Sequence, residues 1–307
     1  MLKLLAIVGP TASGKSALAI RVALEKGGEI VSADSRQIYK YLDIGTAKPS
    51  PEDRRKVPHH FIDILNPDVD YSAGEFGRDA RREIQKIIDR GSLPILVGGS
   101  GLYVKAVVDG FFEGPGKDPE TRERFENLLK SEGPEALLRT LQSVDPESAS
   151  GMDITKPRRI IRALEVYSIT GKPLSQLHTE QSTALPFGVV QVGLAWPRDT
   201  LYDRINQRTD WMFSEGLIDE VKRLQAAGYS PSLNSLNTVG YKEVFEFLSG
   251  KLIREDAIEL VKRNSRRFAK RQLTWFRADK RIRWVKRDKT TSTESLADEV
   301  LKEFAVN

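Results

Sequence analysis

Cysteine is absent from the 307 residues, so the chain can form neither disulfides nor thiolate metal sites. Histidine is scarce as well, because only His59, His60 and His178 occur, and this disfavours a histidine-rich metal site. No apolar run approaches the length of about 20 residues that spans a membrane, and no signal region precedes the first apolar segment. We therefore expect a soluble cytoplasmic protein with no membrane partner, with one large domain or two modest ones.

A glycine-rich loop lies near the N-terminus. Leu4 to Val8 predict a buried strand, Ala17 to Leu24 predict a helix, and the residues between them match the pattern G-x-x-x-x-G-K-[ST]. In such a loop, backbone N–H groups converge on phosphate oxygens at a helix N-terminus. The lysine would neutralise the outer phosphate, and the serine hydroxyl would ligate Mg²⁺. We expect a diphosphate or nucleotide to be bound by Gly9, Pro10, Thr11, Ala12, Ser13, Gly14, Lys15 and Ser16.

An acidic residue follows the second predicted strand. Asp34 stands at or just past the carboxyl end of a short strand that begins at Glu29. Ligands of open α/β sheets gather at the carboxyl ends of the strands, so Asp34 should face the same crevice as the glycine-rich loop. Three interpretations remain open: Asp34 caps the following turn, ligates Mg²⁺, or acts as a general base or substrate-orienting carboxylate.

Two further strands are predicted before residue 100. Residues 61–65 predict a short strand after the adjacent histidines, whose side chains would then point to opposite faces and not share a metal. A capping box at residues 72–75 opens a helix to about residue 89. Residues 94–97 predict a buried strand, but Gly98 and Gly99 follow where an ordinary motor ATPase would place an acid. This departure disfavours a motor ATPase.

The sequence becomes helical in character at residue 114. Asp118-Pro119 and Asp145-Pro146 are typical helix starts, and residues 156–170 form an amphipathic helix with a basic cluster of Arg158, Arg159 and Arg162. Strand character returns only at residues 187–195. We predict an α/β fold, with a P-loop NTPase-like parallel sheet flanked by helices at 1–113 and 186–307. An all-helical insertion domain would occupy 114–185, and the C-terminal region would be helical.

Two arginines share one face of the helix that follows this strand. Asp199 should cap that helix, and Arg204 and Arg208 lie four residues apart. They are either a clamp on the phosphates or ordinary surface arginines.

The last third of the chain is strongly basic. Residues 262–287 contain twelve lysines and arginines against the single acid Asp279, although the whole chain carries a net charge of only +5. A small phosphate ligand does not need so long a cationic strip, so a polyanion is indicated. Aromatic residues within the strip, Trp275 among them, suit either stacking on a base or packing in the core.

The chain resembles the family of bacterial tRNA dimethylallyltransferases, also called tRNA isopentenyltransferases or IPP transferases. The matching stretches follow the family's order along nearly the whole chain, and residues 43–49 are not a general feature of phosphate-binding loops. The stretches are Gly9–Ser16, Ser32–Tyr39, Asp43–Pro49, Val97–Tyr103, Arg158–Tyr167, Val239–Tyr241 and Lys270–Arg277.

The resemblance implies a prenyltransferase that moves the dimethylallyl group from dimethylallyl diphosphate to N6 of adenosine-37, next to the anticodon of tRNAs, and releases diphosphate. Its implied catalytic residues are Asp34, which accepts a hydrogen from N6, and Lys15 and Arg208, which stabilise the diphosphate. Mg²⁺ would bridge Ser16 and the phosphate oxygens, and the chain would act on the tRNA anticodon stem-loop as a monomer. The implied tRNA contacts are Asp34, Ser35, Arg36, Gln37, Ser100, Arg122, Arg158, Arg159, Arg162, Lys270, Arg271, Trp275 and Arg277.

Three other functions remain open from the residues. A small-metabolite kinase would use ATP, but would have little use for the basic strip. A prenyltransferase for free adenine nucleotides would share the loop and Asp34 but not the tRNA contacts. A nucleotide-gated RNA-binding protein would need no catalytic carboxylate.

Overall fold

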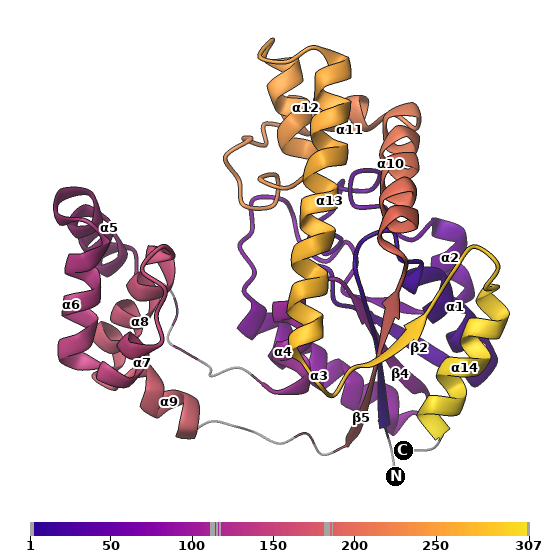
Figure 1. Cartoon of the computed structure of the whole chain (residues 1–307), viewed down its shortest axis with the longest axis horizontal. Helices are drawn as coiled ribbons and strands as arrows, with labels where there is room; N and C mark the ends of the chain where they lie inside the picture. Colours follow the sequence, from indigo (N-terminus) through magenta and orange to yellow (C-terminus); the bar gives the residue numbers. More distant parts are fainter. Residues whose placement is uncertain are drawn as a thin grey trace. The chain divides into compact units, whose positions relative to one another are not determined.

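The computed structural model describes residues 3–110, 118–180 and 187–305, together with Gly114, Gly116 and Leu185. The chain divides into two compact units, Met1–Val108 with Leu185–Asn307, and Asp109–Ala184 (Figure 1). The predicted domain boundaries at residues 113 and 186 and the side chain of His178 lie outside the described residues. None of the helices in the described ranges combines the length and the apolar character that a membrane span requires.

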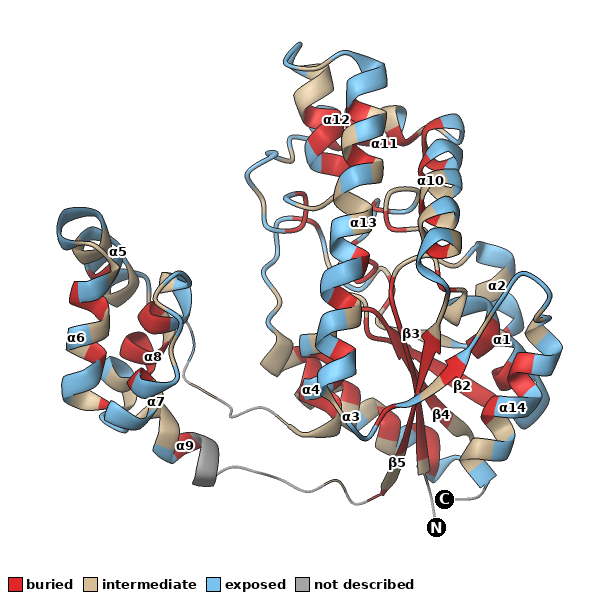
Figure 2. Ribbon diagram, viewed as in Figure 1, coloured by how far each residue is buried: buried red, intermediate tan, exposed pale blue. Residues whose placement is uncertain are grey.

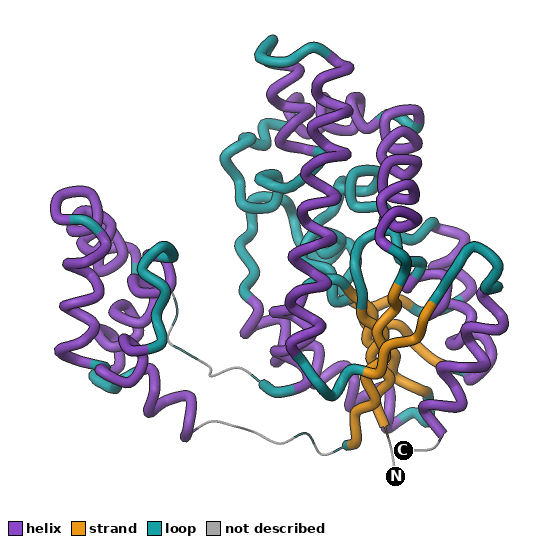
Figure 3. The backbone as a smooth tube through the Cα atoms, viewed as in Figure 1, coloured by secondary structure: helices purple, strands orange, loops and turns teal. Residues whose placement is uncertain are grey.

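The larger unit is built on a six-stranded sheet with the order β3-β2-β4-β1-β5-β6 (Figure 3). The strands are β1 (Lys3–Val8), β2 (Gly28–Ser32), β3 (His59–His60), β4 (Leu93–Gly98), β5 (Gly188–Ala195) and β6 (Arg283–Lys286). Every pairing is parallel, which confirms the predicted fold class. Because β1 lies between β4 and β5, the glycine-rich loop that follows β1 leaves the centre of the carboxyl edge of the sheet.

Alternating side chains of β1 fill two separate cores. Leu4, Ala6 and Val8 pack with α3 (Ala73–Asp89) and α4 (Gly101–Val108) on one face. Leu5 and Ile7 pack with α1 (Lys15–Lys26) and α14 (Thr293–Ala305) on the other. Figure 2 shows the resulting sheet as an almost continuous buried layer. The centre of the sheet is therefore a rigid base for the loops at its carboxyl edge.

A helical layer continues from the carboxyl edge of the sheet. It comprises α10 (Arg198–Ser214), α11 (Leu217–Ala226), α12 (Tyr241–Leu248) and α13 (Arg254–Ala278), while α2 (Pro51–Lys56) lies nearer the sheet. The 25 residues of α13 extend over about 37 Å. Its Val261 belongs to the core of the helical layer and its Phe276 to the core of the sheet. One continuous helix thus ties the two layers together.

The second unit is helical throughout its described residues. It contains α5 (Pro119–Glu132), α6 (Pro134–Val144), α7 (Pro146–Ser150), α8 (Pro157–Thr170) and α9 (Leu174–Glu180). The first four helices each begin at a proline, whose fixed φ and missing N–H suit the first turn. This unit has its own core, to which Phe125, Leu141 and Leu164 contribute.

Local predictions succeeded where capping residues fix a helix. The capping box between Ser72 and Glu75 is confirmed, and α3 ends at Asp89 as expected. The cap predicted at Asp199 is wrong, because α10 begins two residues earlier than that cap implies and Pro197 occupies the N-cap position.

The predicted strand at 61–65 is also wrong. The strand is His59–His60, and left-handed backbone at Phe61 (φ 64°) and Asp63 (φ 57°) turns the chain directly afterwards. Leu65 forms only an isolated bridge with Tyr39.

The C-terminal region was expected to be helical, but it also contains a strand. β6 adds an edge strand to the sheet beside β5, and its first and last residues are exposed cations.

Candidate active site

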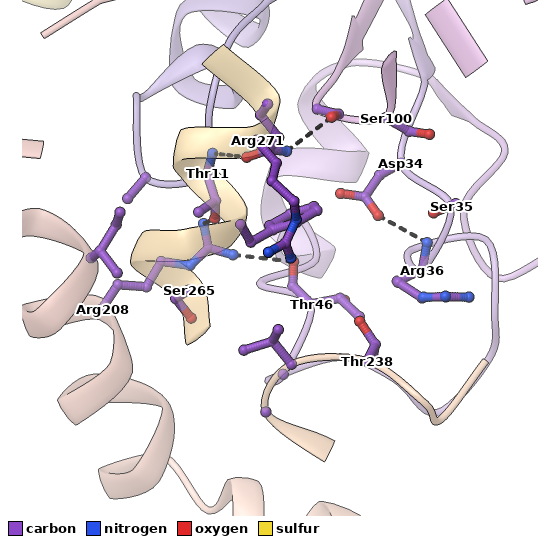
Figure 4. A pocket seen from close by; sticks show the side chains of 18 of the residues that line it. Thr11, Asp34, Ser35, Arg36, Thr46, Ser100, Arg208, Thr238, Ser265 and Arg271 are labelled. Atoms are coloured by element: carbon purple, nitrogen blue, oxygen red, sulfur yellow. Dashed lines mark hydrogen bonds between the residues drawn. The ribbon is translucent and has the colours of Figure 1, made fainter. Parts of the chain in front are cut away.

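A cavity of about 380 Å³ lies at the carboxyl edge of the sheet (Figure 4). Its polar lining comes from the glycine-rich loop, the end of β2 and α10, and its apolar lining includes Ile205, Met212 and Val239. One face of α13 forms a further wall over almost four turns. The α13 residues that line the cavity recur at three- and four-residue spacing: Val261, Ser265, Phe268, Arg271, Gln272 and Trp275.

The glycine-rich loop is held through its carbonyl groups. The carbonyl oxygens of Pro10, Ala12 and Ser13 accept hydrogen bonds from Lys15 Nζ (3.1 Å), Arg204 Nε (2.9 Å) and Trp196 Nε1 (2.9 Å), respectively. Gly14 has left-handed backbone (φ 89°), and a Cβ there would lie 2.4 Å from a guanidinium nitrogen of Arg287. The loop therefore has a fixed shape that only glycine allows at residue 14.

Two cations meet at this loop. Burial, and then the charge of Arg208, lower the pKa of Lys15 to about 8, against an opposing effect of Asp34. Burial also lowers the pKa of Arg208, which Asp34 partly offsets. Arg208 donates to Thr11 Oγ1 (3.1 Å) and to the Thr46 carbonyl (3.3 Å), while its buried Nε has no partner among the described residues. Two desolvated cations that repel each other favour the binding of an anion between them.

Asp34 lines the same cavity, two residues beyond the end of β2. Its Oδ1 accepts hydrogen bonds from the backbone N–H groups of Arg36 (2.9 Å) and Gln37 (3.4 Å). The carboxylate therefore caps the turn that follows it and is also available to a ligand in the cavity (Figure 4).

Arg204 and Arg208 contact different parts of the loop region. Arg208 points into the cavity, whereas Arg204 donates to a loop carbonyl and packs over the ring of Trp196 at 4.7 Å. The two residues also line one hollow of about 440 Å³ together with Lys15 and Ser16. A joint clamp on the phosphates therefore stays a prediction.

Gln272 was missed by the sequence analysis, although it joins two parts of the site. Its Oε1 accepts from the Thr11 N–H (2.8 Å), and its Nε2 donates to the Gly99 carbonyl (2.9 Å). The side chain is only 7% exposed. Gln272 lies within the stretch Lys270–Arg277 that matches the family, but an uncharged residue inside a basic strip does not stand out there.

The structure brings together only some of the predicted tRNA contacts. Ser35, Arg36, Ser100, Arg271 and Trp275 line the cavity with Asp34. Gln37 is buried and donates to the carbonyls of residues 46 and 47, both at 3.2 Å. Lys270 and Arg277 are exposed on α13 and do not line the cavity.

The predicted arginine contacts of the helical insertion belong to the second unit. Arg158 and Arg159 are exposed on α8. Arg122 and Arg162 form ion pairs with the fully buried Glu165, at 3.0 and 2.8 Å. Those two arginines therefore stabilise the core of their own unit.

The basic strip is likewise divided between two kinds of environment. Lys262 pairs with Asp210 (2.8 Å) and Glu259 (3.0 Å), and Arg287 packs over Trp196 at 5.1 Å. The exposed cations of the strip on α13 are Arg263, Arg267, Lys270, Arg271 and Arg277. Beyond the helix, the strip also exposes Lys280, Arg281, Arg283 and Lys286.

The residues present suit a magnesium ion held mainly by a ligand. The described residues contain no cluster of three or more His, Asp or Glu side chains that could hold a metal ion. Ser16 and Asp34 do line one smaller hollow of about 70 Å³ together with Lys15. Mg²⁺ prefers one or two protein oxygens together with phosphate oxygens and water, and this donor set matches that preference.

Comparison of the sequence with known proteins finds a family model and relatives of one kind. The family model described as IPP transferase matches residues 37–279. A tRNA dimethylallyltransferase of Pelotomaculum thermopropionicum is 47% identical over 300 residues, covering 97% of this chain and 95% of the relative. A tRNA dimethylallyltransferase of Geobacter sulfurreducens is 50% identical over 284 residues, covering 92% of this chain and 91% of the relative.

Solved structures agree with these sequences. The full-length tRNA isopentenylpyrophosphate transferase of Bacillus halodurans has a TM-score of 0.73 and 41% identity, covering 100% of this chain and 98% of its own. A eukaryotic dimethylallyltransferase described as acting on tRNA has a TM-score of 0.81 and 27% identity, covering 100% of this chain and 80% of its own.

Proposed function

The chain belongs to the IPP transferase family, and from this premise we propose that it transfers the dimethylallyl group of dimethylallyl diphosphate to N6 of the adenosine next to the anticodon of tRNA. It is a tRNA-modifying prenyltransferase. The observation that carries the detailed reaction is a single cavity in which the phosphate-binding loop and Arg208 meet Asp34 and an apolar wall.

Loss of diphosphate is the first requirement of the chemistry. The allylic C1–O bond breaks and its electron pair leaves with the diphosphate, so developing negative charge must be stabilised. Lys15 and Arg208, with the N–H groups of residues 14–16, are suited to this role because both cations are already desolvated. Bound phosphate oxygens would satisfy the unpartnered Nε of Arg208.

Bond formation at N6 is the second requirement. The N6 lone pair forms the new bond to C1, and the N6 proton becomes acidic as that bond forms. The Asp34 carboxylate accepts the proton, and a carboxylate of ordinary basicity suffices for this task. Its hydrogen bonds to the turn at residues 36 and 37 hold the carboxylate at the cavity.

The apolar wall suits the five-carbon group. Ile205, Met212 and Val261 line the cavity without hydrogen-bonding groups. They would enclose the allylic carbon and exclude water, which would otherwise capture it as the free alcohol.

A magnesium ion fits the same arrangement. The Ser16 hydroxyl would hold it together with phosphate oxygens of the substrate and water. When bound, the ion would neutralise part of the charge on the leaving diphosphate.

The tRNA must present an unstacked adenine to this cavity. We propose that Ser35, Arg36, Gln37, Ser100, Arg271 and Trp275 bind the flipped nucleotide and its neighbours, and that Lys270 and Arg277 contact backbone phosphates. Trp275 is 40% exposed and its ring lies against Gly101, which suits stacking on a base. In the second unit, the exposed Arg158 and Arg159 would contact the stem. Arg122 and Arg162, which pair with Glu165, would reach the stem only through the parts of their side chains that those ion pairs leave exposed. We propose that the chain acts on the tRNA as a monomer.

A transfer assay tests the proposal. The protein is incubated with Mg²⁺, labelled dimethylallyl diphosphate and unmodified tRNA with adenosines on both sides of the anticodon-flanking site. We expect label in the tRNA, and its loss when that one adenosine is replaced. Label in AMP but not in tRNA would indicate an enzyme for free nucleotides. Transfer to neither substrate would contradict the proposal and return attention to ATP.

The role of Asp34 has its own test. Asp34→Asn keeps the side-chain volume and can still cap the turn, but cannot take the proton. We expect kcat to fall by about 10²–10⁴-fold with tRNA affinity nearly unchanged. Equal losses in turnover and affinity would contradict a role as base.

A further inference from the structure

A buried carboxylate lies outside the groups that the reaction uses. Glu220 on α11 is only 3% exposed. Its Oε2 accepts hydrogen bonds from the backbone N–H groups of Asp43 (3.1 Å) and Ile44 (2.7 Å), and its Oε1 accepts from the Gly45 N–H (3.2 Å) and Tyr241 Oη (2.5 Å). None of these four donors is a cation.

Three consecutive N–H groups around one carboxylate form an anion-binding nest. The loop at residues 43–45 is thus wrapped around Glu220. A Cβ at Gly45 would lie 2.4 Å from the ring of Tyr241, so the approach of the loop to that ring depends on glycine. Burial and the neighbouring Glu220 hold the pKa of Tyr241 well above its ordinary value, which keeps the phenol as a donor.

The same loop reaches Arg208 one residue later. The Thr46 carbonyl accepts from Arg208 at 3.3 Å and from Gln37 Nε2 at 3.2 Å. The other protein contact of the Arg208 guanidinium is Thr11 Oγ1 at 3.1 Å. The guanidinium is therefore held at one end by the phosphate-binding loop and at the other by the loop that Glu220 organises (Figure 4).

We propose that Glu220 is a positioning residue for Arg208: it fixes the loop at residues 43–46 so that the Thr46 carbonyl aims the guanidinium at the departing diphosphate. The inference rests on the proposed function, because it takes Arg208 to act in the transfer. Glu220 itself touches no substrate and moves no proton. Its effect is to hold the Arg208 guanidinium where negative charge develops on the departing diphosphate. Misplacing such a group by about 1 Å costs up to roughly 100-fold in rate.

The test is a double-mutant cycle with Glu220→Gln and Arg208→Ala. The carboxamide keeps the shape of the side chain, but its NH₂ group faces N–H donors and releases part of the loop. We expect kcat for transfer to fall about 10- to 100-fold in Glu220→Gln, with tRNA affinity unchanged. In the Arg208→Ala background the same substitution should cost less than about twofold, since the group that it positions is gone.

Glu29→Gln is the matched control. Glu29 is another buried carboxylate of the same unit, it lies on β2, and its partners are Arg90 and His60. We expect it to lower stability without changing kcat. If Glu220→Gln does not fold, Tyr241→Phe removes one of the four donors and carries the same cycle with a smaller factor.

An equal rate loss from Glu220→Gln in both backgrounds would overturn the inference and leave Glu220 a general stabiliser. This result differs from failure of the proposed function, in which the wild-type protein transfers no label to tRNA. In that case, binding of inorganic diphosphate replaces kcat in the cycle. The positioning role would still be supported if Glu220→Gln lowered diphosphate affinity in the protein that retains Arg208 but not in the Arg208→Ala variant.

Discussion

Raising the pH above 8 should weaken the binding of diphosphate. Burial and the charge of Arg208 lower the pKa of Lys15 to about 8 in the free protein. About nine-tenths of the Lys15 side chains are then protonated at pH 7, but only about one-tenth at pH 9. A bound anion favours the charged form, so binding at pH 9 must take up a proton. The affinity should fall about tenfold between pH 7 and pH 9, or about 1.4 kcal/mol.

Calorimetric titration with inorganic diphosphate measures this effect. Lys15→Arg is the matched control, because its guanidinium stays charged throughout and the titration of the ligand itself affects both proteins equally. Arg208→Ala should shift the midpoint of the profile upward, since the charge of Arg208 lowers the pKa of Lys15. Parallel profiles for the wild type and Lys15→Arg would refute the reasoning.

Three further results are expected. Gln272→Ala removes two buried hydrogen bonds that join the phosphate-binding loop to Gly99. The free energy of unfolding in denaturant should fall by about 1–3 kcal/mol, and calorimetry should show weaker diphosphate binding. Unchanged affinity for diphosphate would exclude a role of Gln272 in shaping the loop. Hydrogen bonds from Arg90 hold the pKa of Glu29 at about 2. The ionised carboxylate therefore stabilises the folded protein above the ordinary pKa of 4.5, and this contribution is lost as the pH falls toward 2. Glu29→Gln should cost roughly 2 kcal/mol in urea unfolding at pH 7 and little near pH 2, whereas a pH-independent difference would contradict this assignment. Neutralising both Arg267 and Lys270 to glutamine should weaken tRNA binding and flatten its dependence on log salt by about 1.5, and an unchanged slope would remove that helix surface from the interface.

Local features of the fold were predictable from sequence. The glycine-rich loop, the box at Ser72 and the first-turn prolines of the helical unit each depend on residues a few positions apart. The strand proposed at 61–65 failed for a physical reason, since the segment is rich in apolar residues but has left-handed backbone at Phe61 and Asp63. β6 was missed because a four-residue edge strand that begins and ends with cations lacks an apolar pattern.

The interior of the site was less predictable. Lys15 and Asp34 could be placed because each follows a strand at the same edge of the sheet. Gln272 and Glu220 act on partners 261 and 176 residues away, and no local pattern marks such contacts. A buried glutamate with four neutral donors resembles, in the sequence, any charged residue of a solvated helix face.

The hydrogen bond from the Thr11 N–H to Gln272 also bears on how the protein is made. The ribosome releases the phosphate-binding loop 261 residues before the residue that anchors it. At roughly 5–20 residues per second, these residues take on the order of 10–50 s to translate. Until α13 has been made, the nascent chain lacks the wall that this helix supplies to the cavity. A nascent chain without α13 therefore cannot complete the site, and competence to bind substrate arrives only after this helix has been translated.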